Sequence, residues 1–161
     1  MPRSCKRSLR QSLVSMAERN VRAQIIIPKP PTAYASLARS IKKVLVDALH
    51  VLHEDNVAVE LHILSNAQMR AINRATRGKD EPTNVLSFEG EGFPRADVKG
   101  KKYIGEIYLA PEVIRAKGED AKFLAIHGLL HLFQYTHKKN RYRITMEKAE
   151  DSLLAKLAKR S

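Results

Sequence analysis

Three histidines near the C-terminus have the spacing of metal ligands. His127 and His131 lie four residues apart in FLAIHGLLHLF, and His137 follows six residues later. Four residues make just over one helical turn, so the first two imidazoles project from one face of a helix, and FQYT must turn the chain to bring His137 back. Neutral imidazole is a common ligand of Zn²⁺, and three protein ligands leave a fourth tetrahedral position for water. The spacing therefore predicts an open site for one zinc ion.

The remaining histidines do not share this pattern. We interpret His50, His53 and His62 as packing or surface residues, because an isolated histidine usually has a structural role. The only cysteine, Cys5, lies far away in a basic N-terminal segment. No thiolate is therefore expected to complete a closed structural zinc cluster.

Length and composition indicate one domain. The chain has 161 residues, of which 43% are hydrophobic, enough for an ordinary core. Residues 1–22 are rich in Arg and Ser and are expected to form a basic, flexible extension, with an organellar targeting segment as the alternative, and residues 23–161 form the domain. A single cysteine fits a reducing compartment, and no apolar run approaches the roughly 20 residues that cross a bilayer. We expect a cytoplasmic protein with no membrane partner.

The charge balance points to a polyanion as partner. There are 29 Lys and Arg against 17 Asp and Glu, a formal net charge of +12. Nucleic acid is the commonest partner of so basic a domain, although a merely soluble basic surface is the alternative. Aromatic residues make up only 6% of the chain, so contacts to phosphate should outweigh base stacking and make binding depend on salt.

Hydrophobic periodicity predicts strands mixed with helices. The expected strands are 24–27, 57–64, 84–88 and 103–109, and the expected helices are 35–52, one that opens at Ser65 and ends near Gly78, one that begins at Pro111, 119–134 and 145–159. This order predicts an α+β fold with a small mixed β-sheet packed against helices, and a zincin-like helix that carries the first two histidines against the sheet.

The segment RGKDEPTN, residues 77–84, is the second candidate for chemistry. It places Arg77 and Lys79 among turn residues between a helix and a strand, where their charges can meet phosphate. An ordinary solvated turn is the alternative.

Three segments together resemble one known family. RGKDEPTNVLSF, IGEIYLA and HGLLHLFQYTH, in this order, resemble the YbeY family of metal-dependent endoribonucleases, and the resemblance covers roughly residues 57–157. It implies that His127, His131 and His137 are zinc ligands and that Arg77 acts in RNA binding or catalysis. It also implies a single-strand-specific endoribonuclease that matures and controls the quality of small-subunit ribosomal RNA, with the small ribosomal subunit or its assembly proteins as further partners.

Two positions depart from the family's histidine motif. Gln134 stands where the family has Gly, and Gly accepts positive φ more readily, so the turn into His137 is expected to differ in shape. Thr136 stands where the family has Asp, which removes a carboxylate beside the third ligand. The ligands survive, while weaker activity would follow if that carboxylate tunes the metal.

The expected chemistry is cleavage of a phosphodiester, by water or by the neighbouring ribose 2′-hydroxyl. Zinc would activate the nucleophile near neutral pH, and Arg77 would offset charge on the scissile phosphate. A metalloprotease is a weaker alternative, since that class uses a Glu directly after the first His, where this chain has Gly128. A second alternative is a non-enzymatic RNA-binding or ribosome-assembly factor stabilised by zinc.

Overall fold

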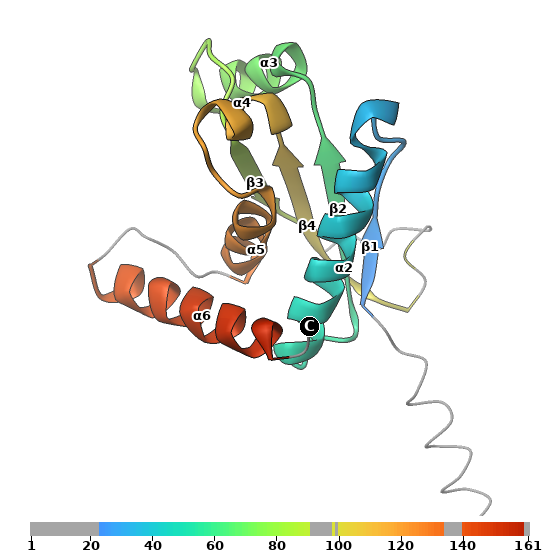
Figure 1. Cartoon of the computed structure of the whole chain (residues 1–161), viewed down its shortest axis with the longest axis vertical. Helices are drawn as coiled ribbons and strands as arrows, with labels where there is room; N and C mark the ends of the chain where they lie inside the picture. Colours follow the sequence, from blue (N-terminus) through green and yellow to red (C-terminus); the bar gives the residue numbers. More distant parts are fainter. Residues whose placement is uncertain (1–22, 91–97, 99, 134–139, 160–161) are drawn as a thin grey trace, which may run out of the picture.

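A computed structural model of the chain describes residues 23–90, 98, 100–133 and 140–159 (Figure 1). The elements, in chain order, are β1 (Gln24–Ile26), η1 (Thr32–Tyr34), α2 (Ala35–Val51), β2 (Val57–Ile63), α3 (Asn66–Arg77), β3 (Val85–Glu89), β4 (Lys102–Leu109), α4 (Pro111–Ala116), α5 (Ala121–Leu132) and α6 (Asn140–Ala158). Every strand and helix that the periodicity predicts is present. The predicted extension 1–22 lies outside the described residues.

The strands form one mixed sheet. Its order is β1-β2-β4-β3, in which β1, β2 and β4 run parallel and β3 runs antiparallel to β4. The connections between the parallel strands contain helices, as parallel pairs require. The predicted α+β fold with a small mixed sheet is confirmed.

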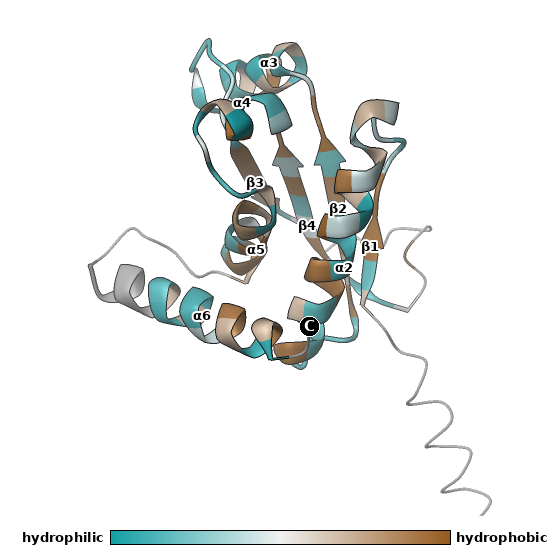
Figure 2. Ribbon diagram, viewed as in Figure 1, coloured by the Kyte–Doolittle hydropathy of each residue, from teal (hydrophilic) through white to brown (hydrophobic). Residues whose placement is uncertain are grey.

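The larger core lies between the sheet and the helices α2 and α5. Both helices pack on the same face of the sheet, with α6 running across their ends (Figure 1). Most residues of α5 are apolar, and hydrophilic residues interrupt the brown of this helix at a few places (Figure 2). Such a composition is expected of a helix that packs against a sheet and two other helices. The fully buried side chains of this core include Ile41, Leu45, Leu49, Leu61, Ile107, Leu109, Ile126, Leu129, Leu130 and Met146. The helix with the two histidines is thus the centre of the core.

A smaller core lies on the opposite face of the sheet. Here Met69 of α3 packs with Leu86 of β3 and Ala110, and partly buried residues such as Phe88 and Tyr108 surround them. Helices α3 and α4 both lie beyond the ends toward which β2 and β4 run (Figure 1). This arrangement places the C-terminal end of α3 near the start of β3.

Local signals determine the two ends of α3. Ser65 and Gln68 form the predicted capping box, in which each side chain meets the backbone N–H of the other residue. Gly78 ends the helix with φ of 70°, a left-handed conformation that glycine adopts at little cost. Arg77 is consequently the last residue of the helix.

Two helix boundaries differ from the prediction. Helix α6 begins at Asn140, five residues before the predicted start at 145, because a helix can extend beyond the apolar repeat that reveals it. Helix α5 is shorter than the predicted 119–134, since Asp120 accepts a hydrogen bond from the N–H of Lys122 and so caps its first turn. Among the described helices, none combines the length and the apolar character needed to span a membrane.

Candidate functional site

The first two predicted ligands face each other on α5. The Nε2 atoms of His127 and His131 are 3.1 Å apart, and their ring planes are inclined by 79°. Two imidazole nitrogens on one tetrahedral Zn²⁺ lie about 3.3 Å apart, given Zn–N bonds of about 2.0–2.1 Å. The pair therefore fits a shared zinc ion, although the role as ligands remains a prediction.

A buried carboxylate from another helix contacts the first of these histidines. Oε1 of Glu150, on α6, lies 2.5 Å from Nδ1 of His127, and Glu150 is 7% exposed. Residue spacing did not predict this contact, because Glu150 lies 23 positions from His127. A signal was present: Glu150 interrupts the apolar stripe of α6 between Met146 and Leu153, both of which are buried.

Arg77 reaches the same place from the end of α3. A cavity of about 270 Å³ is lined by Arg77, Thr83, Asn84, Val85, Ser87, Leu124, His127, Gly128 and His131. A cation fifty residues earlier in the chain thus shares a cavity with both histidines of α5. Lys79, the other predicted RNA contact, is exposed in the following loop and does not line this cavity.

The loop after Arg77 is tied back to α3 at two points. The buried side chain of Asn73 donates a hydrogen bond of 2.8 Å to the carbonyl of Glu81. Arg70 forms two hydrogen bonds with the carboxylate of Asp80, at 2.9 and 2.7 Å, and this contact lowers the pKa of Asp80. Hydrogen bonds to α3 therefore fix the position of the loop RGKDEPTN.

Asn84 connects this loop to the start of the histidine helix. Its Nδ2 donates to Oε2 of Glu119, just before α5, at 2.8 Å, and its Oδ1 accepts from the N–H of Val85 at the same distance. The contact ties Asn84, which lines the cavity, to the residues that directly precede α5. Asn84 was not singled out in the sequence, because asparagine in a turn has an ordinary local explanation.

The third predicted ligand, His137, lies outside the described residues. The two departures from the family motif, Gln134 and Thr136, lie outside them as well. The last described residue before this gap is Phe133, directly after the end of α5.

A second group of possible ligands lies on the opposite face of the sheet. One ligand atom from each of Glu60, His62 and Glu106 lies within 4.8 Å of the others. The hydroxyls of Tyr103 and Tyr108 donate to Glu106, at 3.1 and 2.5 Å. Burial and this carboxylate raise the pKa of Tyr108. His62 was predicted to be a packing or surface residue and this group was not predicted, although the alternation of β2 puts Glu60 and His62 on one face.

The two groups cannot bind the same ion. Val85 and Ser87 of β3 face the histidine cavity, whereas Leu86 and Phe88 face α3 and Tyr108. His62 stacks on Tyr108 with ring centroids 4.4 Å apart and therefore belongs to the second face. Of the two groups, the histidine pair is the one that shares a cavity with Arg77.

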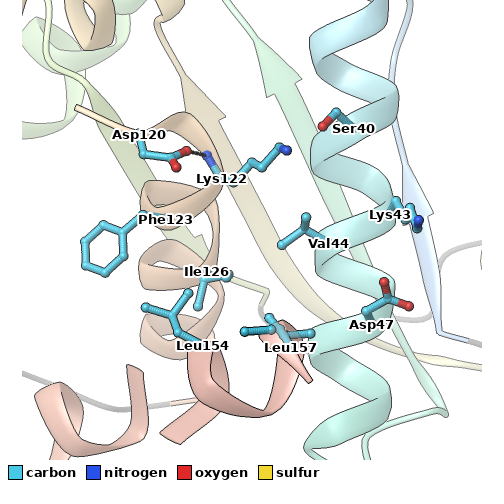
Figure 3. Close-up of a pocket in the computed structure, with 11 residues that line it drawn as sticks. Ser40, Lys43, Val44, Asp47, Asp120, Lys122, Phe123, Ile126, Leu154 and Leu157 are labelled. Carbon is cyan, nitrogen blue, oxygen red and sulfur yellow. Dashed lines mark hydrogen bonds between the residues drawn. The ribbon is translucent and has the colours of Figure 1, made fainter. Parts of the chain in front are cut away.

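A larger hollow lies between α2, α5 and α6 (Figure 3). Its volume is about 500 Å³, and Val44, Ile126 and Leu157 contribute to an apolar lining with a rim of mixed charge. It contains neither a histidine nor an arginine, so its size does not make it the better candidate for phosphate chemistry. The ring of Phe123, at its border, projects from the side of α5 that faces away from α2 (Figure 3).

Comparisons with known proteins point to the same family as the sequence motifs that form this site. Residues 27–158 match the family model described as Endoribonuclease YbeY. A protein named Endoribonuclease YbeY from Francisella tularensis subsp. novicida (strain U112) is 35% identical over 126 residues, which cover 71% of this chain and 75% of that protein. Its namesake from subsp. tularensis (strain SCHU S4 / Schu 4) is 36% identical over 116 residues, covering 65% and 68%.

One solved structure is also similar. The solution structure of TM1509 from Thermotoga maritima has 23% sequence identity and a TM-score of 0.46, and the match covers 86% of this chain and 93% of that one.

The family match extends over most of the chain and includes the Arg77 loop, β4 and the histidine helix. The chain therefore belongs to the endoribonuclease YbeY family.

Proposed function

We propose that this protein is a metal-dependent endoribonuclease that cleaves single-stranded regions of small-subunit ribosomal RNA precursors. The observation that carries the proposal is the shared cavity of Arg77, His127 and His131. Membership of the endoribonuclease YbeY family supports the reaction, and a net charge of +12 supports a polyanionic substrate.

The metal site of this proposal consists of His127, His131 and His137, which hold one Zn²⁺. The facing Nε2 atoms of the first two support it. When bound, Zn²⁺ supplies a Lewis acid that activates water or a ribose 2′-hydroxyl near neutral pH.

Arg77 serves as the catalytic and substrate-binding cation. Its guanidinium can form two hydrogen bonds to the scissile phosphate and offset the charge that develops there. Its position is set by the end of α3 at Gly78 and by the hydrogen bond that ties the following loop to Asn73. Lys79, exposed two residues later, binds a flanking phosphate as a point charge.

Phe123 supports the preference for single strands. It is the one exposed large hydrophobic side chain in the described part of the chain, at 38%, and its ring centroid lies 6.4 Å from that of His127. An unpaired base can stack on such a ring, whereas a base within a duplex cannot leave its neighbours without cost. We also propose that the protein acts in the cytoplasm, where it would meet the small ribosomal subunit or its assembly proteins.

Cleavage of a labelled single-stranded ribosomal RNA fragment tests the proposal. The wild-type protein is compared with His131→Ala, Arg77→Ala and the control Arg39→Ala, which removes an exposed cation of α2. We expect His131→Ala to abolish cleavage, Arg77→Ala to reduce it by about 10²–10³-fold, as for the loss of one transition-state donor, and Arg39→Ala to cleave normally.

The same assay addresses the non-enzymatic alternative. A zinc-stabilised RNA-binding factor would cleave no faster than His131→Ala, and Arg77→Ala would change only its affinity and the salt dependence of binding. Equal cleavage by all variants would indicate a contaminating ribonuclease and refute the proposed activity.

A further inference from the structure

Glu150 occupies a position where the pattern of α6 calls for an apolar residue. Met146, Glu150, Leu153 and Leu157 follow one another at helical spacing on the face that meets the core. A carboxylate that is 7% exposed costs free energy unless a partner compensates for its lost hydration. Packing alone therefore does not explain Glu150.

The partner is Nδ1 of His127, 2.5 Å away. A carboxylate in this place accepts a hydrogen bond from Nδ1–H, which leaves the lone pair of the neutral ring on Nε2. That Nε2 is the atom that lies 3.1 Å from Nε2 of His131. The contact thus selects both the tautomer and the orientation that a metal ligand needs.

We propose that Glu150 is a positioning residue that holds His127 in the Nδ1–H tautomer, with the Nε2 lone pair directed at a Zn²⁺ ion that His127 shares with His131. This inference rests on the proposed metal-dependent function. It assigns a task to α6, which otherwise only covers the ends of α2 and α5. Docking of α6 on the core is then coupled to the orientation of His127 on α5, although α5 and α6 are separate in sequence.

Zinc affinity and the ring tautomer test this role in the full-length protein. Glu150→Gln keeps an acceptor without the charge, Glu150→Leu removes the acceptor and retains apolar volume, and Asp151→Asn is a control at the next, exposed position. Zinc affinity is measured by competition with a chromophoric chelator. The tautomer of His127 is measured in metal-free protein from long-range ¹H–¹⁵N NMR correlations.

We expect Glu150→Leu to bind Zn²⁺ about 10–100-fold more weakly than wild type, Glu150→Gln to fall at the lower end of that range, and Asp151→Asn to be unchanged. Wild-type His127 should show the Nδ1–H tautomer, and Glu150→Leu should shift it toward the Nε2–H form. If Glu150→Leu does not fold, the Gln variant and the wild-type tautomer carry the test.

The outcomes separate this inference from the function on which it rests. Wild-type protein that binds no Zn²⁺ would refute the metal site itself. If the wild-type protein binds Zn²⁺, two results would overturn only the role of Glu150. One is a folded Glu150 variant with the Zn²⁺ affinity of wild type, and the other is wild-type His127 in the Nε2–H tautomer.

Discussion

A Cβ atom on Gly128 would lie 3.2 Å from Cγ2 of Ile107, a fully buried residue of β4. The same atom would lie 3.6 Å from Cγ2 of Val85 in β3. The residue after the first histidine therefore points into the sheet, and glycine allows α5 to approach it closely. A larger side chain at this position, such as the Glu of metalloproteases, would require Ile107 or α5 to shift.

Replacement of Gly128 by Glu should destabilise the fold without creating a protease. It would press a Cβ against Ile107 at the wall of the histidine cavity, and for such overpacking we expect a loss of about 1–3 kcal/mol in the free energy of unfolding. Urea denaturation measures this loss. Ala155→Glu, at an exposed position of α6, is the control and should change stability by less than about 0.5 kcal/mol. A stable Gly128→Glu protein would show that the helix can move away from the sheet.

Zinc binding should depend on His131 and not on His62. The proposed ion is held by His127 and His131 on α5, whereas His62 lies on the other face of the sheet beside Glu60 and Glu106. Isothermal titration with Zn²⁺ should give one tight site in wild type and in His62→Ala, and none in His131→Ala. The reverse result would move the metal site to the Glu60 group.

Loss of the Phe123 ring should weaken binding to single strands more than to duplexes. A stacked base contributes about 1–3 kcal/mol, so Phe123→Ala should lower affinity for a short single-stranded RNA by about 5–150-fold. Fluorescence anisotropy at fixed salt measures this change. Phe123→Tyr preserves the ring and should bind as wild type does. An equal loss for single-stranded and duplex RNA would argue against stacking.

The hydrogen bond between Asn73 and Glu81 should hold Arg77 in place. Asn73 is 2% exposed, and Asn73→Ala removes a buried donor, which we expect to cost about 1–3 kcal/mol in stability. Hydrogen exchange of residues 78–84 should accelerate, and KM for RNA should rise. Thr76→Ala, which removes an exposed hydroxyl bonded within α3, is the control and should leave exchange in this loop unchanged.

Tyr108 should contribute stability that is lost only at strongly alkaline pH. Its folded-state pKa is raised, first by burial and then by its hydrogen bond to Glu106, above an unfolded value of about 10. The contribution is therefore complete below pH of about 10 and declines as pH rises toward the folded pKa. Between pH 8 and pH 10.5, the free energy of unfolding measured by urea denaturation should fall less for Tyr108→Phe than for wild type. Tyr34→Phe, at an exposed contact to Glu112, should behave as wild type.

Local sequence patterns determined the elements of this fold. The alternation in β2, the capping box at Ser65, Gly78 at the end of α3 and Pro111 at the start of α4 depend on residues a few positions apart. Such signals act through backbone geometry and neighbouring side chains, so they can be recognised without a structure. The pairing of His127 and His131 is of the same kind, because one turn of helix brings them together.

Only the tertiary structure decided which distant residues share a site. Arg77 lies in the cavity of the histidines because α3 ends beside β3 and α5 packs on the same strand. Glu150 reaches His127 because α6 docks across α5, and Glu60 meets Glu106 because β2 pairs with β4. These contacts depend on how burial of apolar surface arranges whole helices and strands. The spacing of the polar residues along the chain therefore does not predict which of them will meet.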